Sequence, residues 1–340
     1  MEYMLGWRGE SNKKADKGTI VHKALEICAL AKKAEQDGKK SFKDDVVGKV
    51  LSSNYDPEYL EGIIQKVYKY YSSQFSHHNQ HPRNKWTAKD YKDCSDWVWK
   101  ALRINDGMFD PRKRNVVDAE PHFDITIEED WAAYEYNING ETLKGQLGLK
   151  GTIDLVTDLG DGVYEIIDWK TGRRLDWATG AIKDQNKFFS DAQLRLYHYA
   201  VSHMYPHIKS FLFTIYFIND GGPFTVQFQD QDMPKTKEMV MKKFQFIKET
   251  EQPELIRTLD PKQKWKCSKL CHAGKSTFEG THVQPIKEMR PGQVTQHGEY
   301  MTKCEQVKYM IGKHGIDHVT EKCRQEGFNF ASYKAPGEVD

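Results

Sequence analysis

The chain has 340 residues, with 50 Lys or Arg and 49 Asp or Glu, so its formal net charge at pH 7 is +1. A hydrophobic content of 38% supports a sizeable core, whereas the lack of any apolar run of about 18 residues excludes a membrane-spanning helix. The near-neutral charge excludes a uniformly basic surface but allows local basic patches. Six cysteines are too few for a disulfide scaffold, and the N-terminus lacks a signal-peptide pattern, so we expect a soluble cytoplasmic protein.

The first predicted element is a helix over residues 18–36, because apolar residues recur there at spacings of three and four. Asp16 is available to cap its start, and His22 lies on or beside its apolar stripe. Residues 56–105 also show a helical pattern, rich in basic and aromatic side chains, which indicates a helical insertion at about 41–110. These side chains could bind a nucleic-acid backbone and stack unpaired bases, or the aromatics could fill the seam between helices.

After Pro111 the hydrophobic period changes to two, which is typical of strands. The predicted strands are 116–127, 131–138, 142–147, 149–158 and 163–168, with turns at Asn139-Gly140 and Gly160-Asp161-Gly162. The remaining predicted elements are a helix at 191–205, strands at 211–218 and 224–228 around Gly221-Gly222, and a helix from Pro234 to about residue 251.

This order of elements predicts an α/β (α+β) fold in which helices flank a central mixed sheet. We expect a core over residues 1–252, interrupted by the helical insertion. Residues 253–340 are richer in turns and contain four of the six cysteines, so we expect them to form a C-terminal appendage.

Residues 151–171 form two apolar runs joined by a tight turn, and each run contains one acid, Asp154 or Asp168. A carboxylate in a buried strand needs a basic partner or a cation. Lys170 follows Asp168 by two residues and so lies on the same strand face. Two acids and a lysine on one hairpin are the minimum for metal-assisted hydrolysis of a phosphodiester. For Asp168 and Lys170 alone, a structural ion pair is the alternative.

The motifs that carry chemistry occur in the order Gly18-x-x-x-His22, Glu120, Gly151-x-x-Asp154, Asp168-Trp169-Lys170 and Gln193-x-x-x-Tyr197. In this order, and over about residues 5–250, the chain resembles the RecB-like branch of the PD-(D/E)XK nuclease superfamily. AddB-type nuclease domains and CRISPR-adaptation exonucleases belong to the same branch. The resemblance implies a restriction-endonuclease-like core and a divalent-metal-dependent deoxyribonuclease.

By this resemblance, the side chains of His22, Asp154 and Asp168 and the backbone carbonyl of Trp169 would bind Mg²⁺ or Mn²⁺. Glu120 would be an additional acid that binds the metal directly or through water. A histidine satisfied within the core is the alternative for His22.

The resemblance also assigns catalytic roles outside the metal ligands. Lys170 would contact the attacking water and the scissile phosphate, where an amine can orient the water or take its proton. Gln193 and Tyr197 lie four residues apart on one helical face and would help to hold the lysine and the DNA backbone. Ordinary helix packing is the alternative for these two residues.

Cys267-x-x-x-Cys271, followed by His272, has the spacing of a metal clip. Many relatives in the resembling family use one cysteine ahead of the His motif and three near the C-terminus to hold a [4Fe–4S] cluster, but here no third cysteine closely follows Cys271. Zinc bound by Cys267, Cys271 and His272 or His282 is another alternative. The pattern favours free thiols over an Fe–S cluster or Zn²⁺.

The segment Gly274-Lys275-Ser276-Thr277 ends like a phosphate-binding loop, but Lys269 occupies the position of its first required glycine. We therefore predict no ATPase activity, and any DNA unwinding would need a separate helicase.

The resemblance implies an exonuclease of DNA recombination, repair or end processing that acts on single strands or duplex ends. Its partners would be DNA, a separate helicase and a single-strand annealing or binding protein. The stand-alone architecture suits a phage or mobile-element nuclease in the host-cell cytoplasm. Two alternatives stay open: a non-catalytic DNA-binding scaffold subunit of a helicase–nuclease-like complex, and a structure- or site-specific endonuclease.

Overall fold

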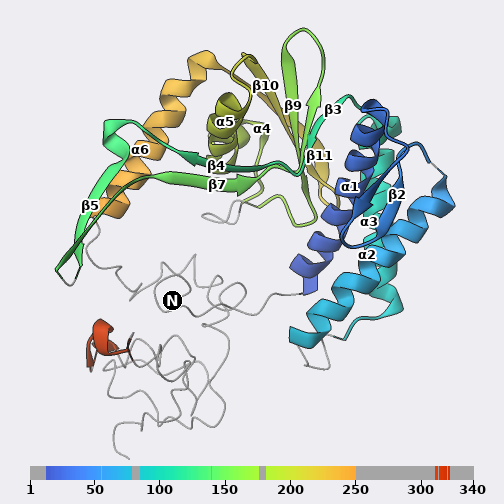
Figure 1. Ribbon diagram of the computed structural model, residues 1–340, viewed down its shortest axis with the longest axis horizontal. Coiled ribbons are helices and arrows are strands. Elements are labelled where there is room, and N and C mark those ends of the chain that lie inside the picture. Colours follow the sequence, from blue (N-terminus) through green and yellow to red (C-terminus); the bar gives the residue numbers. More distant parts are fainter. Residues whose placement is uncertain are drawn as a thin grey trace, which may run out of the picture. The chain divides into compact units, whose positions relative to one another are not determined.

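The computed structural model describes residues 13–54, 56–78, 85–138, 140–175 and 181–249, together with 311–312, 314–319 and 321 near the C-terminus. The chain divides into two compact units, one formed by Asn12–Glu251 and one formed by Met1–Ser11 with Gln252–Asp340. The first unit contains every described residue between 13 and 249 (Figure 1). The predicted boundaries of the core, the insertion and the appendage stay predictions.

The N-terminal part of the unit is a helical layer with one small hairpin. Its elements are α1 (Lys13–Gln36), β1 (Ser41–Asp44), β2 (Gly48–Leu51), α2 (Pro57–His78) and α3 (Ala88–Arg103). The helix predicted at 18–36 is confirmed, but Asp16 lies inside its first turn and is not the residue that caps it. The pattern over residues 56–105 forms two helices, and Thr87 begins the second with a capping box to Asp90.

Most aromatic side chains of α2 and α3 fill the seam between the helices. Tyr91 and Trp99 of α3 donate hydrogen bonds to the carboxylate of Glu61 on α2, as does Ser95. Tyr68 and Trp97 pack against the cluster of buried residues that α1 shares with these helices. For these residues, the packing interpretation of the basic and aromatic segment is correct.

The centre of the unit is a five-stranded sheet in the order β11-β10-β9-β8-β3. Its strands are β3 (Val116–Ala119), β8 (Leu155–Asp158), β9 (Val163–Lys170), β10 (Ser210–Phe217) and β11 (Gly221–Gln229). Strands β9 and β10 pair in parallel and all other neighbours are antiparallel, so the prediction of a mixed central sheet flanked by helices is confirmed. Gly221 and Gly222, predicted to be in a turn, are the first residues of β11 and have positive φ values.

The two faces of the sheet carry different parts of the core. Leu155 and Ile167, on the face toward α1, belong to the cluster that includes Ile20 and Leu25 of that helix. On the opposite face, Val156 and Ile166 pack in the cluster of α5. Helices α4 (Gln185–Phe189) and α5 (Ala192–Met204) lie between β9 and β10 in the chain, and α6 (Met233–Glu249) follows β11. Figure 1 shows α1 to α3 on one side of the sheet, and α4 to α6 on the other side.

Two predicted strands are each broken in the middle. The strand predicted at 116–127 forms β3 and β4 (His122–Thr126), and the strand predicted at 149–158 forms β7 (Gly148–Thr152) and β8. The breaks lie beside each other, because the N–H of Glu120 donates to the carbonyl of Asp154 at 3.0 Å and the N–H of Ile153 donates to Pro121 at 3.1 Å. Glu120 has φ 49°, and Pro121 has no N–H to give to a ladder, so the strand pair bends at this point.

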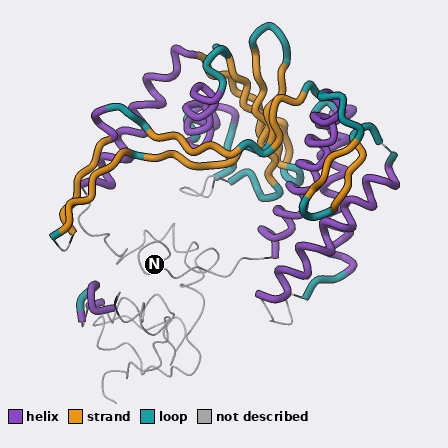
Figure 2. The backbone as a smooth tube through the Cα atoms, viewed as in Figure 1, coloured by secondary structure: helices purple, strands orange, loops and turns teal. Residues whose placement is uncertain are grey.

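Beyond this bend, the chain forms an antiparallel ribbon that leaves the central sheet. Strands β4 and β7 pair with each other, and β5 (Ala133–Ile138) pairs with β6 (Glu141–Gln146) (Figure 2). Trp131, predicted at the start of a strand, lies instead in the short helical turn Asp130–Ala132. The predicted turn residue Asn139 lies outside the described residues.

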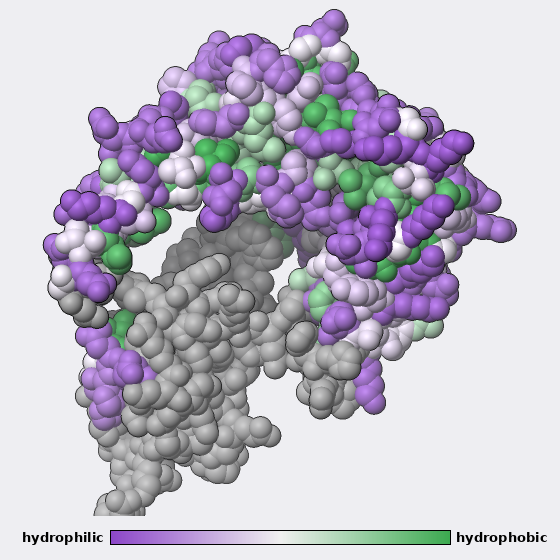
Figure 3. All heavy atoms as spheres, viewed as in Figure 1, coloured by the Kyte–Doolittle hydropathy of each residue, from purple (hydrophilic) through white to green (hydrophobic). Residues whose placement is uncertain are grey.

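The visible surface of the unit is mostly hydrophilic, with small apolar patches between charged side chains (Figure 3). None of the helices in the described ranges has both the length and the apolar character that crossing a bilayer requires.

Candidate active site

Asp154 and Asp168 lie next to each other because of the register of β8 and β9. The last antiparallel pair toward this end of the strands is Leu155 with Ile167, so the two acids occupy the next position on each strand. Asp168 is 3% exposed, and the Oδ2 of Asp154 accepts a hydrogen bond of 2.8 Å from the backbone N–H of Trp169. Trp169 is itself buried between the two functional residues Asp168 and Lys170 of β9.

Lys170 lies on the same strand face as Asp168, as the spacing of two predicts. Its Nζ donates to Oδ1 of Asp168 at 2.9 Å and lies 2.7 Å from Oδ2. Burial alone would lower the pKa of Lys170, but the carboxylate of Asp168 outweighs burial and raises it. The lysine is therefore held in its charged form, with about a third of its side chain exposed to receive a substrate.

His22 reaches the acids from α1, across 132 residues of chain. Its Nδ1 lies 3.3 Å from Oδ1 of Asp154. Burial opposes protonation of the imidazole, yet the charge of Asp154 prevails and raises the pKa of His22. The same pair holds the pKa of Asp154 below its usual value, although burial acts in the opposite direction. The structure therefore brings His22, Asp154, Asp168 and Lys170 together.

Asp168 is the least compensated member of this cluster. Burial raises its pKa to about 6, against the charge of Lys170, and the negative charge of Asp154 adds to the rise. Its Oδ2 is buried and lies 2.7 Å from the ammonium of Lys170, which also donates to Oδ1 at 2.9 Å. A buried carboxylate beside a second carboxylate fits a hard divalent cation.

The side chains of this cluster are not yet oriented to coordinate such a cation. In the part of the chain that the structure describes, no three His, Cys, Asp or Glu side chains are arranged as a metal-binding group. Asp154 and Asp168 direct oxygens toward His22, Trp169 and Lys170. Small rotations of the two carboxylates would be needed to turn their oxygens toward a shared ion.

Glu120 lies at the bend, next to a second acid that the sequence analysis missed. Glu26, four residues after His22 on α1, shares a pocket with Glu120 and with Lys23. Burial and the neighbouring Glu120 raise the pKa of Glu26 to about 8, although Lys23 lies 2.8 Å from it. The spacing His22-x-x-x-Glu26 is the sequence signal that could have indicated this residue, because it places both side chains on one helical face.

Gln193 and Tyr197 extend from α5 toward the same acids. Gln193 donates to the hydroxyl of Tyr197 at 2.8 Å, and that hydroxyl donates to the carbonyl of Thr152 at 3.0 Å. Burial, together with the charges of Asp168 and Asp154, raises the pKa of Tyr197. The tyrosine thus keeps its proton and fixes the chain just before Asp154.

Two glycines of the motifs allow close packing around the site. A Cβ built on Gly18 would lie 2.9 Å from Oγ1 of Thr171, the residue after Lys170. A Cβ built on Gly151 would lie 2.4 Å from the ring of Phe123, which contacts Tyr197 edge-on at 6.4 Å. Gly18 thereby lets α1 approach the end of β9, and Gly151 lets Phe123 cover β7.

The cysteines of the described residues do not contribute to the site. Cys28 and Cys94 are buried free thiols, and burial raises the pKa of both to about 12. Cys267 and Cys271, together with His272 and His282, lie outside the described residues, so the alternatives of an Fe–S cluster, zinc or free thiols there stay open.

Comparisons with known proteins give a family. The model of the PD-(D/E)XK nuclease superfamily matches residues 1–275. No curated protein matches the chain. A solved structure titled "Crystal structure of SSO0001" is 15% identical over 74% of this chain and 81% of that chain, with a TM-score of 0.24, a likeness too low to carry an argument.

Proposed function

Since this chain belongs to the PD-(D/E)XK nuclease superfamily, whose members are metal-dependent nucleases that act on DNA, we propose that it is an exonuclease for DNA recombination, repair or end processing. The observation that carries the nuclease activity is the meeting of Asp154, Asp168 and Lys170 at the ends of two paired strands. Two neighbouring carboxylates, of which Asp168 is 3% exposed, support a cation in this place.

Asp154, Asp168 and His22 are the side chains that would hold Mg²⁺ or Mn²⁺, with the carbonyl of Trp169 and the acid of Glu120 as further candidates. When bound, such an ion lowers the pKa of a coordinated water and offsets charge on the scissile phosphate. The superfamily generally uses divalent ions of this kind.

The chain's own residues supply the rest of the chemistry. Lys170, charged and partly exposed, would orient the attacking water and contact a phosphate oxygen. Tyr197 and Gln193 would hold the backbone before Asp154 in place, since the tyrosine donates to Thr152. The N–H of Trp169 fixes one oxygen of Asp154 and leaves the other toward His22.

The test is a digestion series on labelled linear single strands, linear duplexes and closed-circular DNA, with Mg²⁺, Mn²⁺ or EDTA. We expect metal-dependent release of products from strand ends. Asp168→Asn and Lys170→Met should each lower the rate by about 10²–10⁴-fold, the usual contribution of a positioned acid or base.

Matched controls are Asp124→Asn and Lys150→Met, which alter an exposed ion pair with a separation of 2.7 Å on the β4–β7 ribbon. Both should cleave at the wild-type rate. Continued cleavage by the Asp168 and Lys170 variants would refute the site. Nicking of closed circles would indicate an endonuclease, and an inert wild type that binds DNA would indicate a scaffold subunit.

The RecB/AddB-like subtype, a phage origin, a cytoplasmic location, and a helicase or single-strand annealing or binding protein as partner stay predictions from the sequence.

A further inference from the structure

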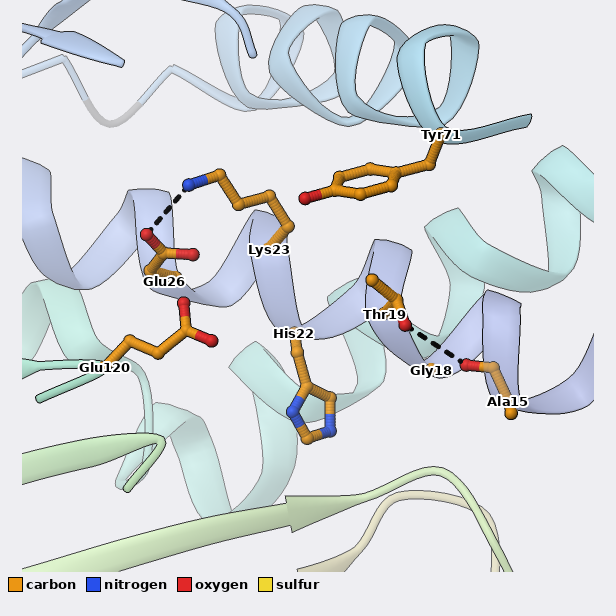
Figure 4. A pocket seen from close by; sticks show the side chains of 8 residues that line it. All are labelled: Ala15, Gly18, Thr19, His22, Lys23, Glu26, Tyr71 and Glu120. Carbon is orange, nitrogen blue, oxygen red and sulfur yellow. Dashed lines mark hydrogen bonds and ion pairs between the residues drawn. The ribbon is translucent and has the colours of Figure 1, made fainter. Parts of the chain in front are cut away.

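A pocket of about 420 Å³ opens beside the cluster of acids and shares His22 with it. Figure 4 shows that most of its wall comes from one side of α1, while Tyr71 reaches over it from α2. The lining residues are Ala15, Gly18, Thr19, His22, Lys23, Glu26, Tyr71 and Glu120. The volume lies within the range of about 300–1,000 Å³ that is usual for small-molecule sites, so the pocket can hold one nucleoside-sized group.

The charges of the lining disfavour a phosphate in this pocket. Lys23 is the one ammonium among the eight lining residues, and its Nζ lies 2.8 Å from Glu26 and 2.9 Å from Asp44. The lysine is thus already compensated, while Glu120 adds a further carboxyl group to the wall (Figure 4). A wall of this kind offers hydrogen-bond acceptors, which suit a neutral group with N–H donors.

The same lysine disfavours a metal ion at Glu26, because its ammonium lies where a second cation would approach that carboxyl group. The described residues also include no group of three potential ligands here. A neutral, planar group with amino hydrogens is the better match to two carboxyl groups and one aromatic ring.

Tyr71 is held in position by a row of aromatic rings. Its ring stacks on Phe75 with centroids 5.7 Å apart and an interplanar angle of 25°, and Phe75 stacks on Trp86 at 6.0 Å and 24°. The Nζ of Lys13 lies 5.4 Å from the Trp86 ring centroid. A ring fixed in this way loses little freedom when a second aromatic group packs against it.

We propose that this pocket binds one nucleobase of the substrate strand, packed against Tyr71, with its amino edge toward Glu26 and Glu120. The inference rests on the proposed nuclease function, because His22 joins the pocket to the active centre and the bound base would belong to a nucleotide near the cleaved bond. A carboxyl oxygen of this pair of acids can accept a hydrogen bond from the amino group of cytosine, whereas uracil presents a carbonyl at that position.

The test measures binding of the full-length protein in EDTA, so that it does not depend on cleavage. Fluorescence anisotropy is recorded with labelled single-stranded oligonucleotides of mixed sequence, each with one abasic nucleotide at a successive position from either end. Aromatic stacking contributes about 1–3 kcal/mol per base, so we expect one abasic position to weaken wild-type binding by about 5- to 100-fold.

The variants assign that position to the pocket. Tyr71→Phe should keep the abasic effect, and Tyr71→Ala should remove it. Tyr136→Ala is the matched control, because Tyr136 is a 40% exposed tyrosine on β5 and does not line the pocket. With cytosine replaced by uracil at the sensitive position, wild-type binding should weaken by about tenfold, and Glu26→Gln should reduce that difference.

The proposal would be overturned if the wild type bound all the abasic oligonucleotides with the same affinity. It would also be overturned if Tyr71→Ala lost affinity equally for every oligonucleotide. Loss of Mn²⁺ binding in Glu26→Gln without any change in base preference would assign the pocket to a cation instead. Failure of the proposed function is seen separately, as an absence of cleavage when Mg²⁺ or Mn²⁺ is added to the wild type.

Discussion

The contact between Gly18 and Thr171 gives the sharpest prediction about how the fold aligns the active centre. A Cβ at position 18 would lie 2.9 Å from Oγ1 of Thr171, whereas ordinary contact begins at 3.4 Å, so Gly18→Ala requires a shift of about 0.5 Å. His22 lies one turn further along α1 and moves with the helix. A misplacement of 1 Å can cost 10²-fold in rate, so a shift of half that size should cost about tenfold.

Stability should behave differently from activity in this variant. Ala is favoured over Gly by about 1 kcal/mol in a helix interior, which offsets part of the cost of crowding. We therefore expect the free energy of unfolding in urea to change by no more than about 1 kcal/mol, while the initial rate of metal-dependent oligonucleotide cleavage falls about tenfold.

The double variant Gly18→Ala/Thr171→Ala provides the control. Removal of Oγ1 relieves the contact, so the double variant should regain most of the rate, and Thr171→Ala alone should change it little. A native rate in Gly18→Ala would mean that Thr171 simply rotates away, and a double variant no faster than Gly18→Ala would show that the contact does not position His22. Either result would refute the reasoning.

Two further predictions concern buried polar groups away from the active centre. Glu165 is 5% exposed, pairs with Arg114 and accepts a hydrogen bond from Thr214. The Glu165→Ala variant should lower the free energy of unfolding by about 3–5 kcal/mol, because it leaves the charge of Arg114 without its carboxylate partner. The double variant Arg114→Met/Glu165→Leu should recover most of this loss. A loss below about 1 kcal/mol in the single variant would contradict the buried pair. Burial lowers the pKa of His198 in the folded protein to about 4. As the pH falls below about 6.5, this histidine is therefore protonated in the unfolded chain before it is protonated in the folded protein, which favours unfolding. Between pH 7 and 4.5, the free energy of unfolding of the wild type should fall by about 2 kcal/mol more than that of His198→Phe. Equal losses in urea denaturation of the two proteins would show that His198 is not held neutral.

Local patterns in the sequence predicted most of the elements and several members of the candidate site. The helix around His22, the strand with Asp168 and Lys170, and the pair of Gln193 and Tyr197 on one helical face all follow from periods of 3.6 and 2. The mixed sheet flanked by helices also followed from the order of these elements. Such features depend on residues a few positions apart, so a single sequence displays them.

The breaks at Glu120 and Asp154 could not be predicted in the same way. Both residues lie in runs that were predicted to be continuous strands. Pro121 is a local sign of the first break, but the bend itself forms where the two runs pair and the N–H of Glu120 donates to the carbonyl of Asp154. A positive φ at a non-glycine residue has no signature in composition or period.

The sequence by itself therefore determined which residue types lie on which face of each helix and strand. Only the tertiary structure decided that Glu26 meets Glu120, that Tyr71 closes the pocket above His22, and that His22 meets Asp154. The physical reason is distance along the chain: these contacts join α1, α2 and two strand ends, and their geometry is set by register and packing between elements, which no local pattern encodes.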